Sequence, residues 1–155
     1  MDSLEAAVAM RPRYQREPPP PGAAHYRARP MLLDAPDTLA TRFAAAISAG
    51  DVTGALDLWV DQPTLIQAGG EALCGREQME PVVRALVEHG IQLQAELRAL
   101  YRAPGVALGT GTLTMSGVDP QGIPYSSEST STVVYLETDA GWRIAIDAPW
   151  GLPAG

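Results

Sequence analysis

The sequence predicts an α+β fold, in which helices pack on one face of a strongly curved, mostly antiparallel sheet. Two observations predict it. Apolar residues recur at helical spacing in three segments before Gly90, and four long strand-like segments follow it, of which the first and the last alternate apolar and polar residues. Helices followed by strands with short connections are typical of α+β proteins. We therefore expect a cone-shaped domain whose interior forms a small-molecule pocket.

The composition excludes several classes of function. The chain has 155 residues, a net charge of −7 and no Lys among its eleven basic residues, so lysine-based covalent catalysis is excluded. An acidic chain without a basic stripe argues against nucleic-acid binding. Cys74 is the only cysteine, which rules out an internal disulfide. We find no membrane-spanning apolar run and no signal pattern, and we expect a cytoplasmic protein.

Residues 1–33 are expected to form a separate arm or linker before a cone domain at residues 34–155. The arm contains the four-proline run Pro18–Pro21 flanked by arginines, which is typical of an extended polyproline II segment. It is either a flexible linker, an arm that packs on a neighbouring subunit, or a docking segment for a partner protein. Its apolar anchors would be Tyr14, Tyr26, Met31, Leu32 and Leu33.

Three helices are expected in the first half of the cone domain. Asp37 is the expected N-cap of the first, which Gly50 ends, and Asp51 is the expected N-cap of a second that includes Trp59. A short extended piece at residues 64–67 follows. The third helix begins after Gly75, and it tolerates Pro81 only in its first turn.

Four strands are expected after Gly90, at residues 91–101, 106–115, 126–136 and 142–148. Apolar and polar residues alternate in the first and the last of them, and the short turns between the four favour an antiparallel meander. The outer face of this sheet is the expected homodimer surface. The last strand carries one carboxylate, Asp147, among apolar residues. It either faces the pocket or is satisfied by backbone groups or by an arginine.

Three short segments resemble the ketosteroid-isomerase-like superfamily, which has the nuclear-transport-factor-2-like fold and includes SnoaL-like cyclases and limonene-type epoxide hydrolases. They are Ala49-Gly50-Asp51, Gly75-Arg76-Glu77 and Gly141-Trp142-Arg143-Ile144 with Asp147. The resemblance covers residues 36–151. It implies a cone-shaped fold, which hosts enzymes, binding proteins and assembly modules alike.

The resemblance also implies that the ketosteroid isomerase mechanism is absent. That enzyme is a worked example of a carboxylate base with a tyrosine and a protonated aspartate as oxyanion hole. The matching positions here are Gln67 for the base, Phe43 for the tyrosine and Thr132 for the aspartate. Gln67 cannot act as a base and Phe43 has no donor group.

Asp147 is therefore the expected acid or base, because the related cyclases and epoxide hydrolases have a carboxylate near this point of the last strand. Arg98 is the expected second catalytic residue, with Glu96 or Glu128 as a second acid. The expected substrate-binding residues are Phe43, Trp59, Leu65, Gln67, Thr130, Thr132 and Trp150. For Thr130 and Thr132, a solvent-facing or dimer-facing position remains the alternative.

The expected function is a cofactor-free enzyme that acts on a hydrophobic, oxygenated small molecule by proton transfer. Isomerisation, cyclisation and epoxide hydrolysis are the candidate reactions. We expect no metal site, because the two histidines lie far apart in the sequence and cysteine ligands are lacking. The alternative is a non-catalytic small-molecule-binding or dimeric assembly module of the same fold.

Overall fold

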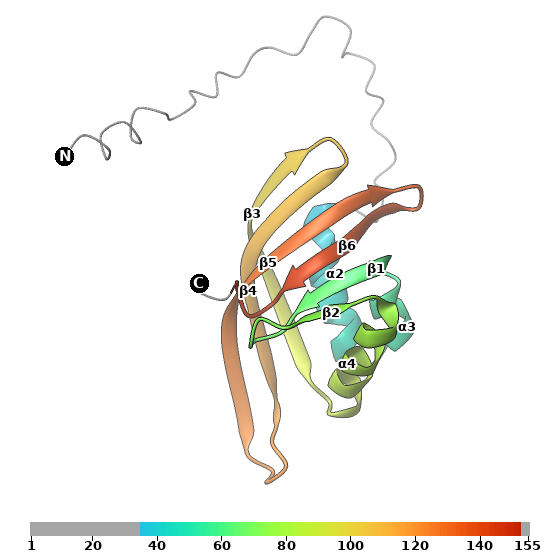
Figure 1. Ribbon diagram of the computed structural model, residues 1–155. Coiled ribbons are helices and arrows are strands. Elements are labelled where there is room, and N and C mark those ends of the chain that lie inside the picture. The colour runs from blue at the N-terminus through green and yellow to red at the C-terminus, as the bar shows by residue number, and fades with distance from the viewer. Residues whose placement is uncertain (1–34, 153–155) are drawn as a thin grey trace, which may run out of the picture. The chain divides into compact units, whose positions relative to one another are not determined.

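The computed structural model describes residues 35–152, so the predicted arm lies outside the described residues. Within residues 35–152, three helices and six strands follow one another (Figure 1). They are α2 (Pro36–Ser48), α3 (Val52–Leu56), β1 (Trp59–Ile66), β2 (Ala72–Cys74), α4 (Arg76–Glu88), β3 (Gln92–Ala103), β4 (Val106–Val118), β5 (Pro124–Thr138) and β6 (Gly141–Ala148).

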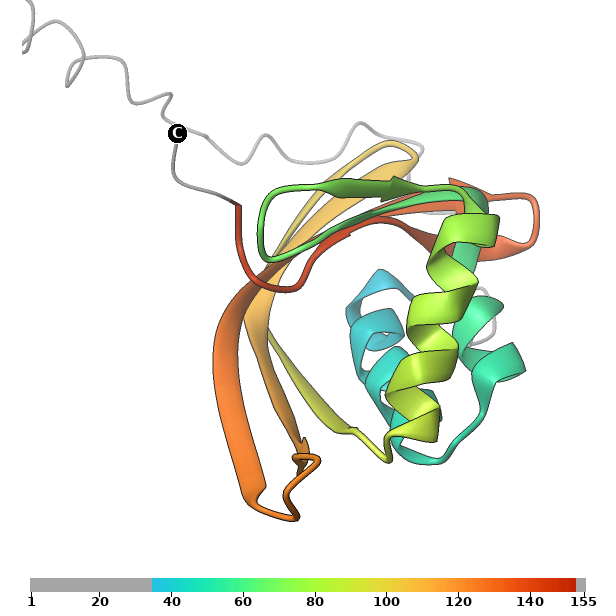
Figure 2. The same cartoon turned by 60° about the horizontal axis from the view of Figure 1, so that its bottom comes forward.

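The strands form one sheet in the order β2-β1-β6-β5-β4-β3. All neighbours are antiparallel except β1 and β6, which run parallel. The sheet curves around the three helices, which all lie on its inner face (Figure 2). The predicted α+β fold is confirmed, and no helix within residues 35–152 is long and apolar enough to cross a membrane.

Three irregularities interrupt the strand register. The first is in β3 between Leu97 and Ala99, the second is where β6 passes Val134 and Tyr135 of β5, and the third is in β1 between Trp59 and Thr64, where it pairs with β6. Bulges of this kind increase local twist and bending. Opposite the first irregularity, a Cβ atom on Gly111 would lie 2.1 Å from the backbone oxygen of Glu96. Glycine is therefore required where β4 passes closest to β3.

The core lies between the helices and the inner face of the sheet. Its most buried side chains come from α2, α4, β5 and β6, and include Leu39, Ile47, Met79, Tyr135 and Ile144. Removing these surfaces from water is the main force that holds helices against sheet. This core fills the space around Tyr135 and Asp147, where the cavities lined by the described residues have volumes of about 20 and 30 Å³.

The second helix is shorter than predicted, and Trp59 belongs to a strand. The Asp51 side chain accepts a hydrogen bond from the Gly54 backbone at 2.8 Å, but α3 ends at Leu56. Trp59 then opens β1, because the backbone N–H of Ile144 in β6 bonds the Leu58 oxygen at 2.8 Å. Strand pairing outweighs the helical spacing of the apolar residues here.

Two expectations about helix starts are also wrong. The first helix has Ala35 at its N-cap and Pro36 at its first position, so Asp37 lies inside the first turn. There its negative charge interacts favourably with the positive end of the helix dipole, but its side chain does not cap the helix. Pro81 is the sixth residue of α4, beyond the first turn. It is exposed, and its missing N–H leaves only the Glu77 carbonyl without its usual donor.

Candidate functional site

Asp147 projects from β6 into the interior of the cone. It lies opposite Val133 of β5 and beside Leu65 of β1 in the register, and paired residues share a face of the sheet. It lines a small cavity of about 30 Å³, which has room for about one water molecule. The other walls are Ala40, Phe43, Ala95, Leu113, Ser131, Val133 and Ile144. Asp147 is the one ionisable side chain among these described residues.

The Asp147 side chain is partly buried, and one of its carboxyl oxygens is buried without compensation. Its Oδ1 atom is inaccessible to solvent and has no hydrogen-bond partner among residues 35–152. An unpaired charge in apolar surroundings is costly, so the protonated form is favoured. Burial raises the pKa of Asp147 from 3.8 to about 7. The group is therefore poised to give or take a proton near neutral pH.

Tyr135, which the sequence analysis did not select, contributes a second unpaired polar atom. Its side chain is fully buried, and its hydroxyl has no partner in the described part of the chain. It lines a cavity of about 20 Å³ that shares Ala40, Ala95, Ser131 and Val133 with the Asp147 cavity. Burial, and next the negative charge of Asp147, raise the pKa of Tyr135 well above its ordinary value. Its hydroxyl is therefore a neutral hydrogen-bond donor facing the same interior.

Three of the predicted apolar residues lie at or beside this cavity. Phe43 of α2 forms part of its wall. The Phe43 ring meets the Trp59 ring edge to face, with centroids 5.6 Å apart and planes at 76°. Trp59 is buried, and its indole N–H also lacks a partner within residues 35–152. Leu65, half-buried beside Asp147 in the register, completes this group.

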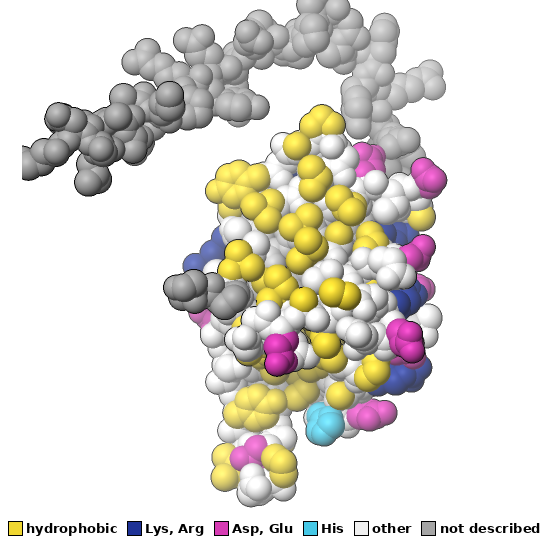
Figure 3. Space-filling model, viewed as in Figure 1, with side chains coloured by type: hydrophobic (Ala, Val, Ile, Leu, Met, Phe, Trp, Pro, Cys, Tyr) yellow, Lys and Arg dark blue, Asp and Glu magenta, His cyan; other side chains and the backbone are white. Residues whose placement is uncertain are grey.

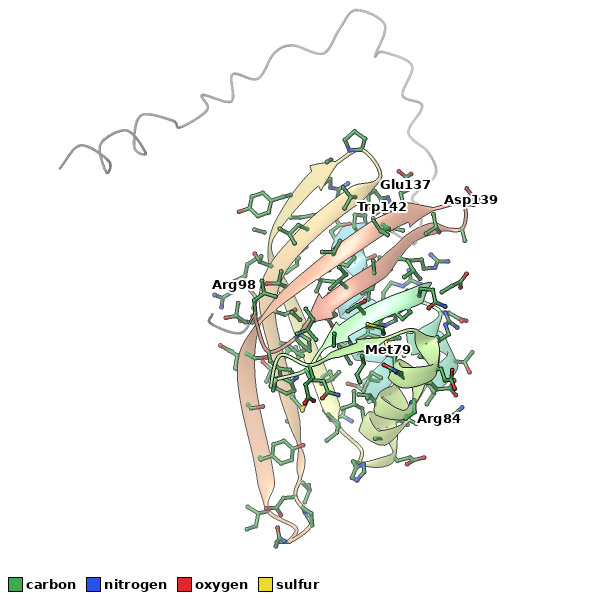
Figure 4. The ribbon with its side chains drawn as sticks, viewed as in Figure 1. Met79, Arg84, Arg98, Glu137, Asp139 and Trp142 are labelled. Atoms are coloured by element: carbon green, nitrogen blue, oxygen red, sulfur yellow. The ribbon has the colours of Figure 1, made fainter. Side chains whose placement is uncertain are left out.

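The other predicted residues are not brought to the cavity. Arg98 is exposed at the irregularity in β3 and points away from the helices (Figure 4). Thr130 and Thr132 alternate along β5 with Ser131 and Val133, which line the cavity, so they face the opposite side of the sheet. Their position agrees with the alternative of a solvent-facing or dimer-facing row.

Gln67 and Trp150 lie at strand ends. Gln67 follows β1, where its backbone N–H bonds the Glu71 oxygen at 2.8 Å. Trp150 follows β6 and is 40% exposed. Glu128 is exposed, and Glu96 is an exposed residue that also lines the neighbouring Tyr135 cavity. The structure therefore supplies no second carboxylate to the walls that residues 35–152 build around Asp147.

Metal ligands are equally scattered. Within residues 35–152, no three side chains of His, Cys, Asp or Glu come close enough together to hold a metal ion. Cys74 is exposed on β2.

A curved sheet that encloses a buried carboxyl group beneath three helices defines a cone-shaped domain with an internal acid–base group. The chain belongs to the SnoaL-like domain family, whose model matches residues 37–146. A search of the curated proteins found no match.

Solved structures support the same fold. An NTF2-like superfamily protein from Salmonella enterica is 17% identical with a TM-score of 0.64, covering 77% of this chain and 89% of that one. A ketosteroid isomerase-like protein from Erwinia carotovora is 14% identical with a TM-score of 0.62, over 71% and 88%. A Xanthomonas campestris protein described as a calcium/calmodulin-dependent protein kinase II association domain is 21% identical with a TM-score of 0.62, over 71% and 80%.

Proposed function

We propose that this protein is an acid–base enzyme that needs no cofactor and acts on a neutral, hydrophobic, oxygenated small molecule. The observation that carries the proposal is the unpaired Oδ1 atom of Asp147 in a small cavity where Ser131 is the one other polar side chain among the described lining residues. Buried carboxyl groups with raised pKa values concentrate at functional sites. A neutral substrate is favoured because no basic side chain lies among the described residues that line the cavity.

Asp147 would move the proton, and Tyr135 would hold an oxygen atom of the substrate. With a pKa of about 7, the carboxylate form takes a proton from carbon or from water, and the acid form returns one to oxygen. The neutral Tyr135 hydroxyl would donate a hydrogen bond to the oxygen on which charge develops. Isomerisation, cyclisation and epoxide hydrolysis all need these two roles. Arg98 is not included, because it lies on the outer face.

The test uses two neutral probes, of which one needs a base and the other needs an acid. Deuterium exchange of the α-protons of cyclohexanone tests the base, and hydrolysis of cyclohexene oxide tests the acid. We expect the wild-type protein to accelerate at least one of them and Asp147→Asn to lose that acceleration. Failure of the wild-type protein with both probes would contradict the proposal.

A non-catalytic assembly module is the second candidate. The small volume of the Asp147 cavity, about 30 Å³, favours it. So does the likeness to the Xanthomonas campestris protein described as an association domain. We propose a cytoplasmic location in either case. If neither probe reacts and the protein forms a stable oligomer, this second candidate replaces the first.

We propose that the outer face of the sheet forms a homodimer. Four large apolar side chains from β3 to β6 are exposed there: Tyr101 by 63%, Leu108 and Leu136 by 39% each, and Ile146 by 38%. Figure 3 shows hydrophobic side chains gathered on this face. A twofold axis through the patch would bury it against its own copy.

Leu136→Glu is expected to convert the dimer into a monomer in native mass spectrometry, because it places two charges in a symmetric apolar interface. Ile123→Glu, on the turn between β4 and β5, is the control and should stay dimeric. A monomeric wild-type protein would refute the proposed interface.

A further inference from the structure

A second hollow lies between the C-terminal half of α4 and the hairpin formed by β4 and β5. Its volume is about 560 Å³, within the range of about 300–1,000 Å³ typical of small-molecule sites. We call it the hairpin groove. In Figure 3 the hairpin stands clear at the lower end of the molecule, and the surface is hollowed beside it. The groove does not include any residue that lines the Asp147 cavity.

The walls of the hairpin groove are mainly apolar. Val82 and Leu86 come from α4, Ile91 from the turn before β3, and Met115, Val118 and Tyr125 from the hairpin. Val118 is 58% exposed and Tyr125 39% exposed. The described residues therefore leave a concave apolar surface open to water, which is unfavourable for large side chains unless something covers them.

Gly117 of β4 lies beside two residues that line the groove. A Cβ atom there would lie 3.0 Å from Cδ1 of Ile91 and 3.1 Å from the hydroxyl of Tyr125. Glycine thus leaves room at this point for Ile91 and Tyr125, which both line the groove. A larger residue at this position would push the two walls apart.

The polar groups of the groove lie at its ends. Nδ1 of His89 lies 2.7 Å from the Ala85 backbone oxygen, which leaves Nε2 available to a ligand. At the other end, Oδ1 of Asp119 already accepts the backbone N–H groups of Gln121 and Ile123. An anionic ligand would be repelled by the Asp119 carboxylate, and the described lining residues include no Lys or Arg to offset that repulsion. The groove therefore favours a neutral occupant.

We infer that the hairpin groove binds an elongated, neutral and mainly apolar small molecule with one polar end near His89. The position of the groove supports a ligand rather than a protein partner. Met115 in the groove and Leu113 in the Asp147 cavity lie two residues apart, on the same inner face of β4. The groove thus continues the interior surface of the cone. The inference does not depend on catalysis by Asp147, because binding is measured without a reaction.

The test uses N-phenyl-1-naphthylamine, a neutral apolar dye whose fluorescence rises in apolar surroundings. The full-length wild-type protein should bind it saturably with one site per chain. Val118→Asp should weaken binding by about tenfold or more, because a charge next to the ligand must be desolvated. Ile123→Asp is the matched control, since Ile123 is 60% exposed on the same hairpin but does not line the groove. Its affinity should equal that of the wild type.

Two further variants separate this inference from its competitors. Ala85→Phe fills the groove without adding charge and should also displace the dye, whereas Asp147→Asn should bind it normally. Absence of saturable binding by the wild type, or equal losses in Val118→Asp and Ile123→Asp, would overturn the inference. Dye binding that disappears as the protein concentration rises would instead assign the groove to a second copy of the chain. Activity of Asp147 toward its probes is measured separately, so either proposal can fail alone.

Discussion

The free energy of unfolding of the wild-type protein is expected to fall by up to about 4 kcal/mol as the pH rises from about 4 to about 8, because of Asp147 alone. In the unfolded chain this carboxyl group has its ordinary pKa of 3.8, and in the folded protein its pKa is about 7. Between these values the folded state binds a proton that the unfolded state has lost. The folded state therefore loses stability, relative to the unfolded state, as the pH rises through this window.

Asp147→Asn removes this titration and should be more stable than the wild type above about pH 7, with little difference below about pH 4. The measurement is urea unfolding of both proteins at several pH values across this range. Asp61→Asn is the control, because Asp61 is an exposed residue of β1 and its removal should leave the pH slope unchanged. Equal slopes in wild type and Asp147→Asn would show that the Asp147 carboxyl group is not held in its protonated form.

Loss of catalysis is the second large effect. Asp147→Asn should lower the rate with the reactive probe by about 10²- to 10⁴-fold, the usual contribution of a positioned acid or base. Asn has nearly the same shape as Asp, so the cavity of about 30 Å³ should stay intact. Its amide group cannot act as an acid or a base near neutral pH. Asp61→Asn should retain the wild-type rate.

The pH dependence tells which form of Asp147 acts. If the carboxylate takes the proton, the rate should rise through about pH 7, and if the acid gives it, the rate should fall through the same value. Tyr135→Phe should weaken binding of the probe oxygen, but the midpoint of the pH–rate profile should stay where Asp147 sets it. An unchanged rate in Asp147→Asn would refute the role of Asp147 as the acid or base.

Much of the fold could be predicted from local patterns. The apolar–polar alternation of a half-buried strand located β3 and β6, and the turn residues on either side located β4 and β5. It also drew attention to Asp147, a charge among apolar residues. Trp59 was misplaced because the apolar residues around it fit a helix as well as a strand. Only pairing of β1 with β6, which are more than 70 residues apart in the sequence, decides between them.

The site was harder to predict because it depends on which face each residue takes. Thr130, Ser131 and Thr132 are chemically similar, and a shift of one residue exchanges the inward and outward sets. Arg98 lies at a register irregularity, which no local pattern indicated. Tyr135 belongs to an apolar run, and a single hydroxyl there was the one available signal. The proposed role of Tyr135 as a hydrogen-bond donor depends on the cavity that it lines and on the unpaired Asp147 oxygen, and no local pattern indicates either.

The most direct test of the account is a titration of the Asp147 carboxyl carbon by NMR, in protein labelled with ¹³C-aspartate. The Asp147→Asn variant identifies its signal by loss. A midpoint near pH 7 is the result that a buried and unpaired carboxyl group predicts. A midpoint near the ordinary value of 3.8 would mean that water or a partner group stabilises the charged form, and it would contradict Asp147 as an acid–base group poised for neutral pH.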